Sequence, residues 1–153
     1  MALFLDTFVN KIDSKGRVSV PASFRASLQG QAFHGIVASP SMKFPAIQCA
    51  GIDWFHRVSG ELSNGELFSD ENDDLTATLF SDAKQLAFDS EGRIMLPESL
   101  TKHAGIGELA AFVGRGANFE IWSPNSFESY KAEARKRALE KGRTLKLRPD
   151  GGK

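Results

Sequence analysis

Residues 13–24 read DSKGRVSVPASF, and residues 89–100 read DSEGRIMLPESL. The second stretch follows the first at a constant offset of 76 residues, without a gap, and six of the twelve positions are identical. Other positions exchange like for like, such as Val18 for Ile94 and Phe24 for Leu100. A repeat of this length indicates that one supersecondary unit has been duplicated. The sequence therefore predicts two copies of a half-domain.

The residues around each copy predict the same order of elements: strand, Gly-Arg turn, strand, short helix, strand, turn, strand and longer helix. In the first copy the predicted strands are 4–12, 17–20, 32–38 and 46–51, the short helix runs from Pro21 to Gly30, and Asp53 caps the longer helix. A further helix is expected to open at Asp70 or Asn72. In the second copy the strands are 86–88, 93–96, 109–114 and 119–122, with helices at 97–105 and from Ser123 to Lys141.

This order divides the chain into a first half at 1–60, a connecting helical segment at 61–85, a second half at 86–142 and a flexible basic tail at 143–153. At 153 residues with 41% apolar residues, one domain-sized core is expected. The single cysteine, Cys49, excludes an intramolecular disulfide and suits a reducing compartment. The first residues lack a basic region and a long apolar run, so we expect an intracellular protein without a membrane span.

Charge is segregated along the chain although the formal net charge is zero. Residues 61–89 hold eight acidic residues against one basic residue, whereas residues 131–148 hold eight basic residues against two acidic ones. Two solvated helix faces, or a charge match within the molecule, are the simplest interpretation. A neutral total argues against a uniformly basic coat for nucleic acid.

Several short motifs known from enzymes occur here, but without the neighbouring elements or companion motifs that those enzymes require. Residues 105–110 match the dinucleotide-binding pattern, but they follow a predicted helix and lead into a strand, which is the reverse of the required order. Residues 99–102 match Ser-x-x-Lys without its companion motifs. The three histidines and Cys49 show no metal-ligand spacing. We therefore predict no enzyme activity, no metal site, no cofactor and no small-molecule substrate.

The Asp-x-x-Gly-Arg turn carries a different kind of chemistry. An aspartate can accept backbone N–H groups inside its own turn, and glycine permits the positive φ that such a turn needs. The arginine at the exit is then held at a fixed, projecting position. Asp13, Gly16, Asp89, Gly92 and Arg93 are accordingly predicted to be structural, with the Asp–Arg pairs stapling the two hairpins.

The first turn carries more positive charge than the second, because Lys15 stands where the second copy has Glu91. Cations that are repeated by oligomerisation would make a surface that binds phosphate, whereas Glu91 would repel it. We predict that the first copy contacts nucleic acid and that the second is the scaffold. The predicted DNA-binding residues are Lys11, Ser14, Lys15 and Arg17.

At these residues the chain resembles the MraZ family of bacterial transcriptional regulators. The resemblance is carried by residues 9–21 and 89–97, and residues 103–106 and 119–122 also fit. It implies an α+β fold of two AbrB-like swapped-hairpin units, related by a pseudo-two-fold axis and closed into a β-barrel with short and longer flanking helices. The DNA-contacting loop of the family corresponds to Lys15 and Arg17 here.

The resemblance also implies a function. It implies a ring-shaped homo-oligomer that binds short direct repeats in double-stranded DNA upstream of its own gene and regulates, as a repressor, the division and cell wall gene cluster. Such a protein would be cytoplasmic and nucleoid-associated. This chain departs from the family in residues 73–78, which are acidic where relatives are rich in arginine, and in residues 46–50, which are unusually polar.

A second interpretation is an oligomeric scaffold or protein-interaction module that never needs DNA. The acidic segment 61–89 of one subunit and the basic segment 131–148 of the next would suit it. The two interpretations differ in their response to salt, since DNA binding falls log-linearly with salt concentration while a scaffold dissociates.

Overall fold

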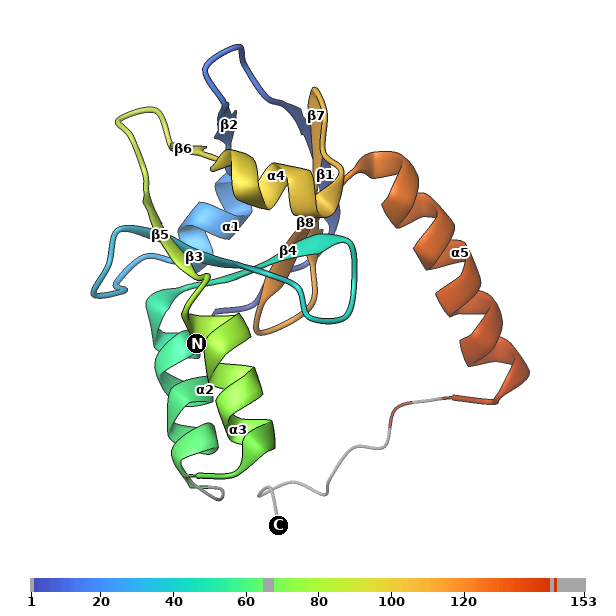
Figure 1. The fold of residues 1–153 in the computed structure, drawn as a ribbon. Helices are drawn as coiled ribbons and strands as arrows, with labels where there is room; N and C mark the ends of the chain where they lie inside the picture. Colours follow the sequence, from blue (N-terminus) through green and yellow to red (C-terminus); the bar gives the residue numbers. More distant parts are fainter. Residues whose placement is uncertain (1, 65–67, 144, 146–153) are drawn as a thin grey trace.

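The two copies fold into antiparallel strands flanked by helices, in the order that the repeat predicts (Figure 1). The structure is a computed structural model that describes residues 2–64, 68–143 and 145. The first half contains β1 (Thr7–Lys11), β2 (Arg17–Ser19), α1 (Ala22–Ser27), β3 (Gly35–Pro40), β4 (Ala46–Ala50) and α2 (Ile52–Ser63). A connection follows through α3 (Asp70–Leu75) and the π-helical turn η1 (Thr76–Phe80). The second half contains β5 (Lys84–Ala87), β6 (Arg93–Met95), α4 (Glu98–Ala104), β7 (Leu109–Gly114), β8 (Phe119–Trp122) and α5 (Pro124–Glu140).

Strands from the two halves are interleaved in one sheet. Its order is β1-β7-β8-β4-β3-β5, and every neighbouring pair is antiparallel. The first strand of each half therefore pairs with the third strand of the other half, β1 with β7 and β5 with β3. The order reads the same when each strand is replaced by its equivalent in the other copy, so the pairing follows the repeat of the sequence.

The sheet is not closed into the expected barrel. Within the described residues it ends at β1 on one side and at β5 on the other, and these two strands do not pair with each other. The reason lies in the turns that follow them. Each edge strand runs through its Asp-x-x-Gly-Arg turn into β2 or β6, and β2 and β6 pair with each other in a separate two-stranded ladder. The α+β class is confirmed, and the closed barrel is wrong.

An aromatic core fills the space between the sheet, the two-stranded ladder and the short helices. Phe24 of α1 packs on Phe4 and Phe119, with ring centroids 5.2 and 4.9 Å apart, and Leu100 occupies the matching place in α4. Val18 and Ile94, the central residues of the two ladder strands, point into the same core, whereas Ser19 and Met95 on the other face are exposed. Alternation within these three-residue strands explains that arrangement. The buried members from the ladder and its ends are Val18, Val20, Ile94 and Leu96.

The structure corrects two local predictions and confirms a third. Gly51, not Asp53, is the N-cap of α2, and the backbone N–H of Asp53 donates to Gln31 Oε1 at 3.0 Å, so a distant side chain satisfies a donor of the first turn. Helix α3 begins at Asp70, one of the two predicted starts, and its N-cap is Ser69, whose Oγ accepts from the backbone N–H of Asn72 at 3.1 Å. The strand expected from residue 32 begins at Gly35, where it first pairs with β5.

The first strand is also shorter than expected. Asp6 has a positive φ of 76°, which interrupts the extended backbone before β1 begins at Thr7. Phe4 makes only an isolated bridge to Gly116. The predicted basic tail lies outside the described residues except for Arg143 and Leu145.

Candidate nucleic-acid interface

The first turn is organised by Asp13. Its Oδ1 accepts the backbone N–H groups of Lys15 at 2.9 Å and Arg17 at 2.8 Å, and its Oδ2 accepts Nε–H of Arg17 at 2.7 Å. The backbone N–H of Gly16 donates to the carbonyl of Asp13, and Gly16 has a φ of 85°. One carboxylate thus closes the turn and holds the arginine at its exit.

The second turn repeats this geometry atom for atom. Asp89 Oδ1 accepts the backbone N–H groups of Glu91 and Arg93 at 2.9 Å each, and Oδ2 accepts Arg93 Nε–H at 2.8 Å. Gly92 has a φ of 75°. The two turns are therefore built by the same local interactions, and any difference in what they bind must come from the residues that differ between them.

The difference lies in the residue between the aspartate and the glycine. In the second turn Glu91 Oε2 forms an ion pair with Arg93 Nη2 at 2.8 Å, so Arg93 is paired with two carboxylates. In the first turn Lys15 occupies the equivalent position and is exposed. Within the described chain Arg17 forms its ion pair through Nε only, to Asp13. The first turn, with Lys15 and Arg17 against Asp13, is cationic, whereas the second, with Asp89 and Glu91 against Arg93, is anionic.

The two turns lie beside each other at one end of the molecule (Figure 1). The backbone N–H of Val20 donates to the carbonyl of Gly92 at 3.1 Å, and that of Leu96 donates to the carbonyl of Gly16 at 2.9 Å. Asp13 is close enough to Arg93 to contribute to raising the pKa of that guanidinium, after the larger effect of the hydrogen bond that Arg93 donates to Asp89. A ligand that reaches one turn therefore comes close to the other.

The carboxylates of both turns are held ionised. The backbone hydrogen bond from Arg17 is the largest cause that lowers the pKa of Asp13, helped by the Arg17 side chain, and burial opposes it in part. Asp89 has its pKa lowered in the same way by Arg93. An ionised carboxylate accepts the bonds that shape each turn.

The remaining predicted DNA-binding residues flank the first turn. Lys11 is exposed at the end of β1, opposite Leu109 of β7, and Ser14 is exposed at the corner of the turn. Two grooves lie on either side of this loop, one of about 590 Å³ against β6 and α4 and one of about 620 Å³ against the segment before β7. The structure therefore brings Lys11, Ser14, Lys15 and Arg17 together on one projecting loop.

Arg25 is a residue that sequence reasoning missed. It extends from α1 over Gly92, and its Nε–H donates to the carbonyl of Val20 at 3.0 Å. Its equivalent in the second copy is Thr101, and the groove beside the second turn is smaller, about 250 Å³. The sequence does contain a signal for Arg25. Directly after the repeated stretches 13–24 and 89–100, the first copy has the charged Arg25 where the second has the neutral Thr101.

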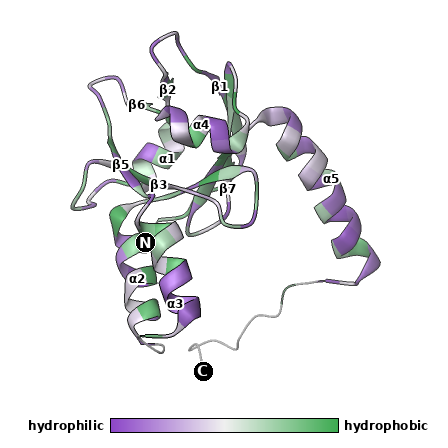
Figure 2. Ribbon diagram, in the orientation of Figure 1, coloured by the Kyte–Doolittle hydropathy of each residue, from purple (hydrophilic) through white to green (hydrophobic). Residues whose placement is uncertain are grey.

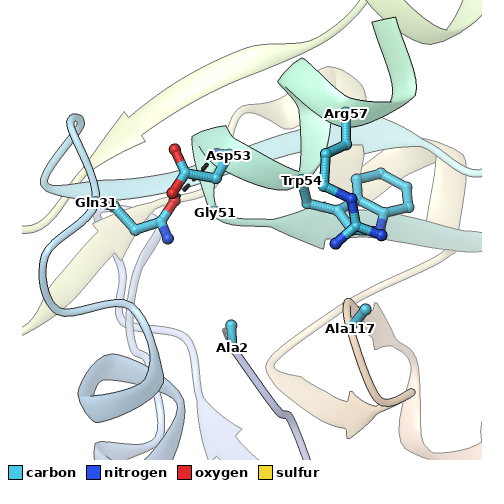
Figure 3. Close-up of a pocket in the computed structure, with 7 residues that line it drawn as sticks. All are labelled: Ala2, Gln31, Gly51, Asp53, Trp54, Arg57 and Ala117. Carbon is cyan, nitrogen blue, oxygen red and sulfur yellow. Dashed lines mark hydrogen bonds between the residues drawn. The ribbon is translucent and has the colours of Figure 1, made fainter. Parts of the chain in front are cut away.

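A separate cavity of about 340 Å³ lies at the α2 end, away from both turns (Figures 1 and 3). Figure 3 shows the side chains of Trp54 and Arg57 side by side on one wall and Gln31 beside Asp53 on the other. Ala2 and Ala117 complete the lining shown there. Its position gives it no part in the cationic loop.

No group of three or more His, Cys, Asp or Glu side chains in the described ranges is placed to hold a metal ion. No helix in the described part of the chain has the length and apolarity that crossing a membrane requires.

Comparison with known proteins identifies the class as a transcriptional regulator. The chain is 46% identical over 146 residues to the "Transcriptional regulator MraZ" of Rickettsia canadensis (strain McKiel), which covers 95% of this chain and 98% of the relative. It is also 46% identical over 147 residues to the protein of the same name from Rickettsia bellii (strain OSU 85-389), with the same coverage. Residues 79–148 match the family described as "MraZ protein, putative antitoxin-like". The chain belongs to the MraZ family, as the paired motifs predicted.

Proposed function

We propose that the chain is a sequence-specific DNA-binding regulator, and that the first turn is its contact with DNA. The observation that carries this proposal is the contrast between the turns. The same hydrogen-bonded loop presents Lys15 in the first copy and a Glu91–Arg93 ion pair in the second. A loop whose shape is fixed before binding loses little conformational entropy when it meets DNA.

The proposed contacts follow from the two side chains. Lys15 is exposed and has no ion pair within the described residues, so it suits a phosphate as a point charge. Arg17 uses Nε for Asp13 and retains two terminal nitrogens, which suit a phosphate or the O6 and N7 acceptors of a guanine in the major groove. Lys11 and Ser14 would add contacts at the edge of the same loop.

One loop with few cations binds DNA weakly, so we propose that several chains act together. A ring-shaped homo-oligomer would place one such loop from each chain on successive short direct repeats. Family membership supports the proposed target, the promoter of its own division and cell wall gene cluster, with repression as the outcome and a cytoplasmic, nucleoid-associated location.

We further propose that the fold is a duplicated AbrB-like swapped-hairpin unit, with halves at 1–60 and 86–142 joined by 61–85. The exchange of β1 and β5 between the halves supports this description. In a swapped unit each turn is supported by the strands of both halves, so the two turns stand at a fixed separation.

The test is fluorescence anisotropy with DNA from upstream of the gene and with random DNA, over a range of salt concentrations. Lys15→Ala is expected to weaken binding to both DNAs and to reduce the salt slope by about 1. Arg93→Ala is the matched control for Arg17→Ala, because each removes the arginine of an equivalent turn. We expect Arg17→Ala to abolish preference for the promoter and Arg93→Ala to retain it.

If both arginine variants fold and lose promoter preference equally, the proposal that only the first turn contacts DNA is contradicted. Absence of any preference over random DNA would instead favour a scaffold, the second candidate. The observation that favours a scaffold is the separation of charge between α3, which is acidic, and residues 131–143, where six basic residues stand against two acidic ones.

A further inference from the structure

Helix α5 packs on the body with one side and leaves the other without a partner. Phe127 is buried, and Tyr130, Ala134, Arg137 and Ala138 are half-buried on the same side. Figure 1 shows the helix extending away from the sheet. One exposed face of the helix carries Glu128, Lys131, Ala132, Arg135, Lys136 and Leu139, and the adjoining side, also exposed, carries Ser129, Glu133 and Glu140.

This exposed face is basic and has an apolar residue within it. Lys131, Arg135 and Leu139 follow one another at intervals of four residues, which places them in a row along the helix. Leu139 is 75% exposed. Neither Lys131 nor Arg135 forms an ion pair with another residue of the described chain. A leucine among lysines and arginines is more typical of a protein contact than of a phosphate contact.

The first half shows what covers the equivalent helix there. Helix α2 leaves the sheet after β4 as α5 does after β8, and η1 lies against it with Leu79 and Phe80 near Trp54 and Phe55. Figure 1 shows α3 alongside α2, whereas no other described helix lies alongside α5. Since the second half provides no equivalent of α3 within the described residues, the face of α5 is open to another chain.

Helix α3 has the chemistry that complements this face. Its acidic residues are exposed and form no ion pairs within the described chain; they are Asp70, Glu71, Asp73 and Asp74. Phe68, directly before the cap of the helix, is 93% exposed. Figure 2 colours α3 and the far part of α5 as mostly hydrophilic, and the two lie apart in the chain.

We propose that the exposed face of α5 binds α3 of a second copy of this chain. Lys131, Arg135 and Lys136 would face the carboxylates of α3, and Leu139 would cover Phe68. The proposal rests on the self-association that the proposed function includes, but not on DNA binding. Because the two surfaces differ, a pair joined by one contact keeps one free α3 and one free α5, and repetition produces a ring or a filament.

The test uses charge reversal on each surface of the full chain. One variant carries Lys131→Glu, Arg135→Glu and Lys136→Glu, and the other carries Asp70→Lys, Asp73→Lys and Asp74→Lys. Each alone is expected to raise the dissociation constant for self-association by about 100-fold or more, since like charges then face each other. Light scattering after size-exclusion chromatography measures the mass, and circular dichroism checks folding.

The two variants mixed together, or both sets of changes in one chain, restore opposite charges at the contact. Either is expected to recover the mass of the wild-type oligomer, and a misfolded variant would not be rescued. A monomeric wild-type chain, unchanged mass in the variants, or failure of the rescue would overturn the proposal. Loss of DNA binding in the α5 variant with unchanged mass would also overturn it, and would assign the face to DNA.

DNA anisotropy on the same samples separates this proposal from the proposed function. An intact oligomer that depends on the charge match but shows no preference for the promoter would refute the DNA-binding proposal and leave this contact standing. A wild-type chain that is monomeric but binds the promoter would refute the α5–α3 contact and leave the DNA-binding proposal standing.

Discussion

Arg25 of the first half lies directly over Gly92 of the second turn. A Cβ at position 92 would lie 2.7 Å from Cζ and from Nε of Arg25, closer than real side chains approach. The same Nε–H donates to the carbonyl of Val20, so the arginine cannot move away without losing that bond. Position 16 is different, because there a Cβ would meet only the carbonyl of Leu96 at 3.6 Å.

Gly92→Ala is therefore expected to destabilise the fold more than Gly16→Ala. Both substitutions strain a residue with positive φ, at a cost of about 1 kcal/mol. Gly92→Ala also displaces Arg25, which adds about 1 kcal/mol for the lost hydrogen bond. Urea unfolding of both variants measures the difference. In an Arg25→Ala background the two alanine variants should cost the same; a difference that persists there would mean that Arg25 is not its cause.

The fall in the free energy of unfolding at low pH should depend on Asp13 and Asp89. Their pKa values are lowered in the folded chain, chiefly by backbone hydrogen bonds from Arg17 and Arg93. A group with a lowered pKa contributes stability above its unfolded value, near 3.8, and this contribution is lost as the pH falls through the folded value. Below about pH 4 the wild type should lose stability more steeply than the Asp13→Asn and Asp89→Asn double variant.

Carbon-13 titration of the carboxyl groups gives the direct measurement for this prediction. Both aspartates should titrate below the ordinary value of 3.8. If the wild type and the double variant lose free energy of unfolding equally at low pH, the two turns are not the source of the pH dependence.

The turns could be predicted from the sequence because their information is local. The carboxylate bonds to residues two and four positions further along, and glycine stands where φ is positive, so a five-residue pattern specifies the shape. Strand order is not local. Nothing in the residues of β1 alone selects β7 over β2 as its partner, and the exchange between halves came only with the family resemblance.

The errors have the same origin. The prediction of a closed barrel was wrong because β2 pairs with β6 in a separate ladder. The edge strands β1 and β5 lead into that ladder and do not pair with each other. The capping of α2 was wrong because Gln31, distant in the sequence, satisfies a donor that a local pattern assigns to a nearby side chain. Arg25 was missed because its role depends on Gly92 in the other copy.

Cys49 is expected to be unreactive in the folded protein. It is fully buried in β4, and burial, together with the nearby Glu120, raises the pKa of its thiol well above 9.0. The thiolate is the reactive form, so both access and ionisation are lacking. Labelling with a chromogenic disulfide reagent should be at least about 100-fold slower in native buffer than in denaturant. Rapid labelling of a folded sample would show that β4 opens readily.

Buried Glu120 should matter for stability through its partners. Its Oε1 accepts from Trp122 Nε1 at 2.9 Å and lies 3.3 Å from Arg115 Nη1. Glu120→Ala leaves the buried indole N–H without this acceptor, which costs about 1–3 kcal/mol. Glu120→Gln keeps an acceptor oxygen and should cost less, although it loses the ion pair. Thermal or urea unfolding ranks the two, and equal costs would mean that the charge and not the hydrogen bond is what counts.

Glu91→Lys should convert the second turn into a copy of the first. The substitution removes the carboxylate that binds Arg93 Nη2 and places a cation where the first turn has Lys15, while Asp89 still closes the loop through backbone bonds. Affinity for DNA is expected to rise, and the slope of log affinity against log salt to steepen by about 1, because one more phosphate is neutralised. Glu91→Gln should produce an intermediate affinity.

Asp82→Lys adds the same charge at an exposed site away from the turns and is the matched control. If Asp82→Lys strengthens binding as much as Glu91→Lys does, the gain is a general effect of net charge, and the turns are not the DNA-binding surface.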